Sequence, residues 1–159
     1  MVLLVACSLA RAFPAATWVE EDDYKWRPLD IATDGRPGFT MLDPSDTSIR
    51  FKNRLDAEKS LQNQVYLNGS GVALGDVDGD GQCDIYLCGF DSPNHLYLNR
   101  GDWKFEEAAR AYGVDCDGKD STGAVFADLD GDGDPDLIVN TVHSGTLIFR
   151  NGGEGFSPV

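Results

Sequence analysis

An internal repeat of about 52 residues constrains this chain more than any other feature. Residues 71–81 (GVALGDVDGDG) align with residues 123–133 (GAVFADLDGDG), 52 positions later. The match continues at 84–87 with 136–139 and, after a one-residue slip, at 96–99 with 147–150. A period near ~50 residues is typical of β-propeller blades built from four short strands, whereas the common helical repeats are shorter. The repeat therefore indicates stacked blades.

Short apolar runs within each repeat predict where the strands lie. In the first repeat they favour strands near 71–77, 84–89, 95–99 and 105–107, with a helical turn near 108–111. The strand cores are continuously apolar, as at 137–139 and 147–149, which is typical of sheets buried on both faces. With 18 glycines and 7 prolines, the composition suits a turn-rich protein. We predict an all-β fold, a partial β-propeller of about two four-stranded blades with an extended N-terminal segment.

The chain divides further by composition. We expect a signal segment at 1–16 that lacks residues at its start, a linker at 17–36, a strand segment at 37–66, a first blade at 67–118 and an incomplete second blade at 119–159. Within the third of these segments, the run FTMLD leading to Ile49 resembles FEEAA leading to Val114. Residues 37–52 are therefore a candidate propeller-closing strand.

The second blade stops where its outer strand should begin. We expect its third strand to have an unpaired edge, and its outward face to carry Leu137, Val139 and Leu147. Two blades cannot close a ring, so we also expect a longer protein with further blades. An open edge and an exposed apolar face promote association, and the isolated chain should aggregate or dimerise.

Each repeat carries the pattern Asp-x-Asp-Gly-Asp-Gly-x-x-Asp. Calcium prefers ~6–8 hard oxygen ligands, and a tight loop can direct side chains from positions 1, 3, 5 and 9, with the main-chain carbonyl of position 7, at one centre. Glycines between the aspartates permit the turns that such a loop requires. We expect two Ca²⁺ sites. Their ligands are Asp76, Asp78, Asp80, Gln82 and Asp84 in the first loop, and Asp128, Asp130, Asp132, Asp134 and Asp136 in the second.

An EF-hand begins with the same residues, and position 12 distinguishes the two motifs. An EF-hand has a bidentate Glu there, whereas this chain has Leu87 and Val139 inside apolar runs too short for helices. An aspartate-rich turn without metal is the simpler alternative for one loop. Two copies in register favour metal binding.

These residues resemble the FG-GAP/VCBS repeats of integrin α-chain propellers and of the ASPIC/UnbV group, bacterial secreted proteins related to cartilage acidic protein. The resemblance is strong over about residues 66–157, and its trailing pattern Asn-x-Gly-x-x-x-Phe fits Asn99, Gly101 and Phe105. The second copy, from Asn151 to Phe156, is one residue short and so departs from this pattern at its hairpin. The resemblance implies structural metal ions between the first two strands of each blade, with partners at the opposite rim.

Charge and the N-terminus bear on partners and location. A net charge of −14 repels nucleic acid and anionic lipid, and no apolar stretch approaches the length of a membrane span. The apolar run before Ala10-Arg11-Ala12 resembles a signal peptide, and Leu4-Val5-Ala6-Cys7 resembles a lipobox that would place a lipid anchor on Cys7. We expect an exported, extracellular, periplasmic or cell-surface protein. A buried N-terminal strand is the alternative.

Three cysteines follow the leader. Cys83 and Cys88 lie on one extended segment, too far apart for a disulfide. We expect Cys88 to pair with Cys116 in an oxidising compartment and Cys83 to stay free. Exchanged roles for Cys83 and Cys88, or three unpaired thiols, remain alternatives.

No residue set in the sequence resembles an enzyme active site. His95 and His143 lack a second histidine or cysteine at ligand spacing, and no serine or cysteine lies in a nucleophile motif. We therefore expect no catalytic residues and a calcium-binding module for adhesion, scaffolding or ligand binding, with an unidentified protein or glycan partner. The alternative is a propeller segment of an extracellular enzyme, such as a polysaccharide lyase or hydrolase, since a fold does not fix a function.

Overall fold

The computed structural model describes residues 19–26 and 38–159, which cluster into two units, 1–40 and 41–159. In the first unit, β1 (Val19–Glu20) and β2 (Lys25–Trp26) form an antiparallel hairpin in which Val19 faces Trp26. This hairpin lies within the segment expected to be a linker. The expected signal segment and Cys7 lie outside the described residues.

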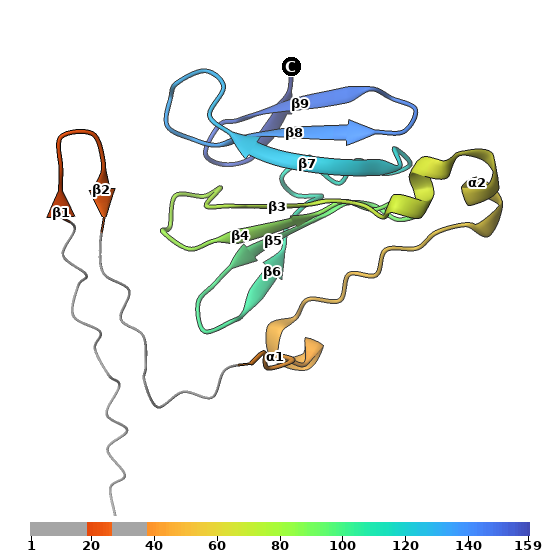
Figure 1. The fold of residues 1–159 in the computed structure, drawn as a ribbon, viewed down its shortest axis with the longest axis horizontal. Helices are drawn as coiled ribbons and strands as arrows, with labels where there is room; N and C mark the ends of the chain where they lie inside the picture. Colours follow the sequence, from red (N-terminus) through yellow and green to blue (C-terminus); the bar gives the residue numbers. More distant parts are fainter. Residues whose placement is uncertain (1–18, 27–37) are drawn as a thin grey trace, which may run out of the picture. The chain divides into compact units, whose positions relative to one another are not determined.

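The second unit contains two four-stranded antiparallel sheets, here called blade 1 and blade 2. Blade 1 consists of β3 (Val72–Gly75), β4 (Asp84–Leu87), β5 (His95–Asn99) and β6 (Phe105–Glu107), and blade 2 of β7 (Ser121–Ala127), β8 (Asp136–Thr141), β9 (Thr146–Asn151) and β10 (Phe156–Pro158). In both sheets the strands lie in the order of the sequence. Figure 1 shows the two sheets stacked face to face. The predicted all-β partial propeller is confirmed.

The expected open edge of β9 is wrong, because β10 pairs with it. Phe156 lies opposite Asn151, and Pro158 lies opposite Phe149. The shortened hairpin still closes: the Gly153 N–H donates to Asn151 Oδ1 at 2.9 Å, and the Gly152 N–H donates to the Gly155 carbonyl at 3.0 Å. Gly153 has a φ of 82°, which only glycine adopts without strain. The second blade therefore has four strands in spite of the missing residue.

The main core lies between the two blades. Blade 1 contributes buried side chains such as Tyr86 and Leu98, and blade 2 contributes Leu137 and Val139, neither of which is exposed to solvent. The inner strands approach closely at two equivalent glycines, since a Cβ added to Gly71 would lie 2.7 Å from the Cα of Gly123. Glycine at this position allows the blades to meet.

Two details of the predicted register are wrong. Leu137, Val139 and Leu147 point toward blade 1, and the outward face of blade 2 instead carries a row formed by Val125, Ile138 and Ile148. Continuously apolar strands give no alternation from which the inward residues could be identified. The one-residue slip between repeats also comes later than expected, after Gly153, because Asn151 occupies the position of Asn99.

Residues 41–68 contain helices where a strand was expected. These are α1 (Pro44–Thr47), α2 (Ala57–Gln62) and the 3-10 helix η1 (Gln64–Asn68), and no strand forms between residues 38 and 68. The predicted closing strand at 37–52 is therefore wrong. Pro44 begins α1 and Asp43 caps it, accepting the Ser45 N–H at 2.8 Å. The helices in the described segments are all too short or too polar to traverse a bilayer.

Instead of pairing as a strand, residues 42–54 cross the face of blade 1 that points away from blade 2 (Figure 1). The Arg50 N–H donates to the Tyr97 hydroxyl at 3.2 Å, and the Phe51 ring meets His95 edge-on with centroids 5.4 Å apart. A loop segment therefore covers part of this face.

Candidate metal centres

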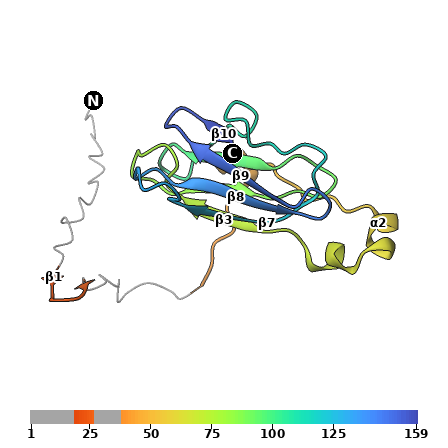
Figure 2. The same cartoon turned by 90° about the horizontal axis from the view of Figure 1, so that it is seen from above.

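Both aspartate loops lie at the same end of the blades. Figures 1 and 2 show the β3–β4 and β7–β8 connections at the end opposite α2. Each loop turns through two glycines in the left-handed region, with φ values of 72° and 84° at Gly79 and Gly81, and 81° and 98° at Gly131 and Gly133. Such turns reverse the chain within each loop, which lets residues several positions apart approach one centre.

The last aspartate of each loop is the most buried. Asp84 is fully buried, and its carboxylate accepts the N–H groups of Val77 at 2.9 Å and Asn99 at 2.7 Å. Burial raises the pKa of Asp84, although the two main-chain hydrogen bonds oppose this change. Asp136 repeats the arrangement and accepts from Leu129 at 3.0 Å and from Asn151 at 2.8 Å. Each of these carboxylates therefore joins its loop to the third strand of its blade.

Three carboxylates converge in each loop. Each member of the groups Asp76, Asp78, Asp84 and Asp128, Asp130, Asp136 can place one oxygen within 4.8 Å of the other two. Asp80 and Asp132, also predicted as ligands, are not in these groups. The Asp80 carboxylate accepts the Gln82 N–H at 2.8 Å, and Asp132 accepts the Asp134 N–H at 3.0 Å. Positions 1, 3 and 9 thus lie together, and positions 5 and 7 lie beside them.

An arginine contacts the second aspartate of each loop. Arg100 Nη1 is 2.8 Å from Asp78 Oδ2, and its Nε is 3.0 Å from Glu106. Arg150 Nε is 3.0 Å from Asp130 Oδ2. The two arginines occupy different positions of the repeat, since Arg100 follows Asn99 and Arg150 precedes Asn151. Both reduce the repulsion among the carboxylates.

The donor set fits a hard divalent cation such as Ca²⁺. Carboxylate oxygens are the ligands that Ca²⁺ prefers, and three negative charges this close strongly favour a cation. Asp76 adds a more specific sign: its Oδ2 accepts the Gly81 N–H at 2.9 Å, but its Oδ1 is buried and has no hydrogen-bond partner. A buried carboxylate oxygen normally has a partner. A cation held by Asp76, Asp78 and Asp84 would supply one.

Two asparagines that organise these loops were not identified as functional residues from the sequence. The Asn99 side chain donates to the Cys83 carbonyl at 3.1 Å, and Asn151 donates to the equivalent Pro135 carbonyl at 3.2 Å. Asn151 also donates to the Val77 carbonyl of blade 1 at 2.9 Å. Their spacing of 52 residues is the signal that could have found them, had the slip been placed correctly.

The cysteines and histidines lie elsewhere. Cys83, Cys88 and Cys116 are free thiols, so the expected Cys88–Cys116 disulfide is not formed in the structure. Burial raises the pKa of Cys88 to about 12 and also raises the pKa of Cys116, which disfavours the thiolate that disulfide formation requires. His95 stacks on Tyr97, and His143 Nε2 lies 3.1 Å from the Tyr66 hydroxyl.

Comparison with known proteins identifies the repeat. Residues 76–139 match the model of a family described as FG-GAP-like repeat. The chain is 36% identical over 106 residues, 65% of its length, to cartilage acidic protein 1 of Homo sapiens, and 33% identical over 73 residues, 46% of its length, to cartilage acidic protein 1 of Xenopus tropicalis. It spans only 16% and 11% of these relatives. The family match contains both aspartate loops, β4 to β7 and the start of β8, so residues 76–139 carry the FG-GAP-like repeat.

Proposed function

We propose that the chain is a calcium-stabilised, non-catalytic propeller module of an exported protein. The observation that carries this proposal is the repeated triad of converging carboxylates, with the unpartnered, buried Oδ1 of Asp76 in the first copy. The ligands are those expected from the sequence, with positions 1, 3 and 9 as the core of each site.

The bound cation would cross-link the loop residues. Asp84 already fixes β5 through the Asn99 N–H and the loop through the Val77 N–H, so a cation on its remaining lone pairs would join Asp76 and Asp78 to the same point. Ca²⁺ supplies charge neutralisation and a tolerant coordination shell. Because the ligands belong to a hairpin connection and not to a cleft, the expected role of each site is structural.

The place of action is proposed from two independent features. The N-terminal pattern resembles an export signal, and the two relatives are named as acidic proteins of cartilage. This chain is likewise acidic, with a net charge of −14. A module stabilised by Ca²⁺ suits an exported protein, because the ~10⁻⁴–10⁻³ M affinities typical of extracellular modules require abundant calcium.

Calorimetric titration of the metal-free chain with CaCl₂ tests this function. We expect two equivalents of Ca²⁺ to bind. If each Kd is ~10⁻⁴ M, ~1 mM Ca²⁺ should stabilise the fold by roughly 1.4 kcal/mol per site. Asp76→Ala and Asp128→Ala should each remove one equivalent. Asp117→Asn, which changes an exposed aspartate outside the loops, should retain both.

The same four proteins should be melted in Ca²⁺ and in EDTA. The unsubstituted chain and the control should lose stability in EDTA, and each loop variant should lose about half as much. An unchanged melting temperature in EDTA, with no heat of Ca²⁺ binding, would remove the basis of the proposal.

A further inference from the structure

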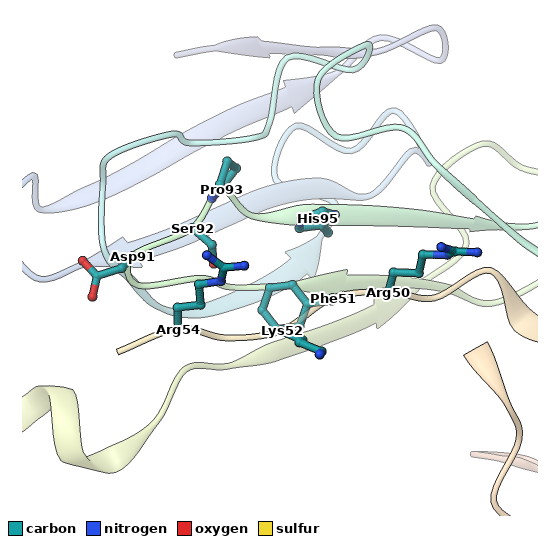
Figure 3. A pocket seen from close by; sticks show the side chains of 8 residues that line it. All are labelled: Arg50, Phe51, Lys52, Arg54, Asp91, Ser92, Pro93 and His95. Atoms are coloured by element: carbon teal, nitrogen blue, oxygen red, sulfur yellow. The ribbon is translucent and has the colours of Figure 1, made fainter. Parts of the chain in front are cut away.

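A basic pocket lies on blade 1, outside the aspartate loops. Its volume is about 330 Å³. Figure 3 shows its lining residues, which are Arg50, Phe51, Lys52, Arg54, Asp91, Ser92, Pro93 and His95. Three cations within five residues are unusual in a chain with 13 basic and 27 acidic residues. The pocket is therefore a local reversal of the overall charge.

The main chain of this segment is held while its charged side chains are left free. The Phe90 N–H donates to Asn53 Oδ1 at 3.1 Å, Asn53 Nδ2 donates to the Ser70 hydroxyl at 2.7 Å, and the Asp91 N–H donates to the Arg54 carbonyl at 3.2 Å. Phe51 and Asn53 thus anchor the segment at alternate positions. Within the described part of the chain, the side chains of the three intervening cations form no ion pair and no hydrogen bond, and all three are exposed.

The carboxylate at the edge of the pocket is already engaged. Asp91 forms an ion pair with Lys59 and accepts the Asp56 N–H at 2.5 Å. The hydrogen bond from Lys59 holds the pKa of Asp91 below its ordinary value, so this carboxylate stays ionised and tied to Lys59. Lys59 also contacts Asp120. The cations of the pocket therefore keep their positive potential for an external anion.

Acidic side chains in a neighbouring pocket limit the extent of the positive region. This second pocket shares Pro93 and His95 with the basic pocket, and it is also lined by Glu107, Asp115, Asp117 and Arg110. His95 Nδ1 lies 3.5 Å from Glu107 Oε1 on that side, without forming a hydrogen bond. A ligand with several spread charges would meet these carboxylates. A ligand with one localised anionic group would not.

The remaining lining combines apolar rings with an unsatisfied hydroxyl. Phe51, Pro93 and the imidazole of His95 offer ring surfaces, and Ser92 Oγ is buried without a hydrogen-bond partner. The volume lies at the lower end of the ~300–1,000 Å³ typical of small-molecule sites. A pyranose ring has apolar C–H faces and peripheral hydroxyls that match these two kinds of surface, and arginine forks match carboxylate or sulfate.

We propose that this pocket binds the anionic group of an acidic saccharide, a uronate carboxylate or a sugar sulfate. Arg50 and Arg54 pair with the anion, Lys52 adds positive charge, and the rings with Ser92 contact the sugar. The site is independent of the aspartate loops and should function without calcium.

Calorimetry of the metal-free 159-residue chain, dialysed out of EDTA into chelator-free buffer at constant low ionic strength, tests the assignment. The probes are methyl glucuronide, which carries one carboxylate, glucose 6-sulfate, which carries one sulfate, and neutral methyl glucoside. We expect one or both anionic sugars to bind at least ~10-fold more tightly than the neutral one, because charge-assisted hydrogen bonds are the stronger kind. The two anionic sugars distinguish a carboxylate from a sulfate as the preferred group.

The variants Arg50→Gln and Arg54→Gln should each weaken binding by ~5-fold or more. Lys119→Gln makes the same charge change at an exposed residue outside the pocket and should stay within ~2-fold. Melting without sugar confirms that each variant folds, as expected for exposed side chains that form no hydrogen bond or ion pair within the described residues. Equal binding of the neutral sugar, or equal effects of all three substitutions, would overturn the proposal. Tighter binding of an oligoglutamate peptide than of either sugar would overturn the saccharide assignment.

Discussion

The two aspartate loops share a sequence pattern but differ in their surroundings. In the first, Asp76 and Asp78 are half-buried, whereas their equivalents Asp128 and Asp130 are exposed. Both oxygens of Asp128 accept main-chain N–H groups, from Gly131 at 2.7 Å and from Gly133 at 3.1 Å. Asp76 leaves one buried oxygen without a partner. The first loop is thus incomplete by itself, and the second is closer to self-sufficient.

The first site should therefore bind calcium more tightly than the second. An opposing effect comes from position 7, where the second loop has Asp134 in place of Gln82 and so one more negative charge. That side chain is exposed, and position 7 is expected to offer its carbonyl, so water screens the added charge. Asp76 Oδ1 is buried and loses no hydrogen bond when calcium binds, and this advantage should outweigh the added charge of Asp134.

Equivalent faces of the two blades also differ in how far they are buried. Blade 1 covers the inward face of blade 2, where Phe126 is half-buried, but the equivalent Leu74 on the outer face of blade 1 is 62% exposed. Residues 42–54 lie against residues of β4, β5 and β6. The repeat therefore gives each blade an equivalent face. Blade 1 covers this face of blade 2, and residues 42–54 cover part of it on blade 1.

The largest expected effect comes from replacing the buried aspartate at position 9, where the two loops have the same hydrogen bonds. Asp84→Ala and Asp136→Ala should each lower the free energy of unfolding by ~2–4 kcal/mol even in EDTA, because two main-chain N–H groups lose their buried acceptor. Denaturant melts in EDTA measure this loss. The two values should agree within ~1 kcal/mol, and a loss confined to calcium-loaded protein would contradict the structural role.

Asp84→Asn and Asp136→Asn are the matched controls. The amide keeps one acceptor oxygen and also removes a carboxylate that burial disfavours, since burial raises the pKa of Asp84. These variants should therefore be less destabilised in EDTA than the alanine variants. Both should still lose calcium binding at one site.

The repeat made much of the fold and of the site predictable. Aspartates at fixed spacing and apolar runs at a constant offset indicated the blades and the loops. The orientation of Leu137 and Val139 could not be predicted, because runs that are apolar on both faces lack a period. The closing strand was mistaken because Asp43 and Pro44 form a helix start inside a run that otherwise resembles a strand. The basic pocket depends on contacts between residues some 40 positions apart, which no local pattern records.

A smaller effect is expected on the calcium affinity of each loop when its arginine is replaced. Arg100→Gln and Arg150→Gln each remove a cation that competes with calcium for an aspartate, so each should raise affinity at its own site. Exposed ion pairs are worth up to about 1 kcal/mol, which limits the gain to ~5-fold. Titration of each variant should show the larger gain for Arg100, whose guanidinium approaches both Asp78 and Asp80. A gain at the opposite site would contradict the pairing.

The smallest expected effect is a difference in thiol reactivity between the loop end of the blades and the space between them. Cys83 is exposed beside the first loop, whereas Cys88 is buried and its pKa is raised to about 12. Since the thiolate is the reactive form, native iodoacetamide labelling at pH 7 to pH 9 should modify Cys83 well before Cys88. Mass spectrometry of the peptides gives the order, and unfolding in urea should abolish the difference. Cys88 labelled first in the native protein would contradict the buried placement.

The hydrogen bond from Asn151 to the Val77 carbonyl has a consequence for how such repeats respond to calcium. Val77 also donates to Asp84, and the Asn151 N–H donates to Asp136, so two residues, Val77 and Asn151, join the buried carboxylate of one loop to that of the next. We therefore expect the ordering of one loop by calcium to lower the entropic cost of ordering its neighbour. A row of blades built in this way would gain and lose calcium in a concerted manner, like links in a nearest-neighbour chain.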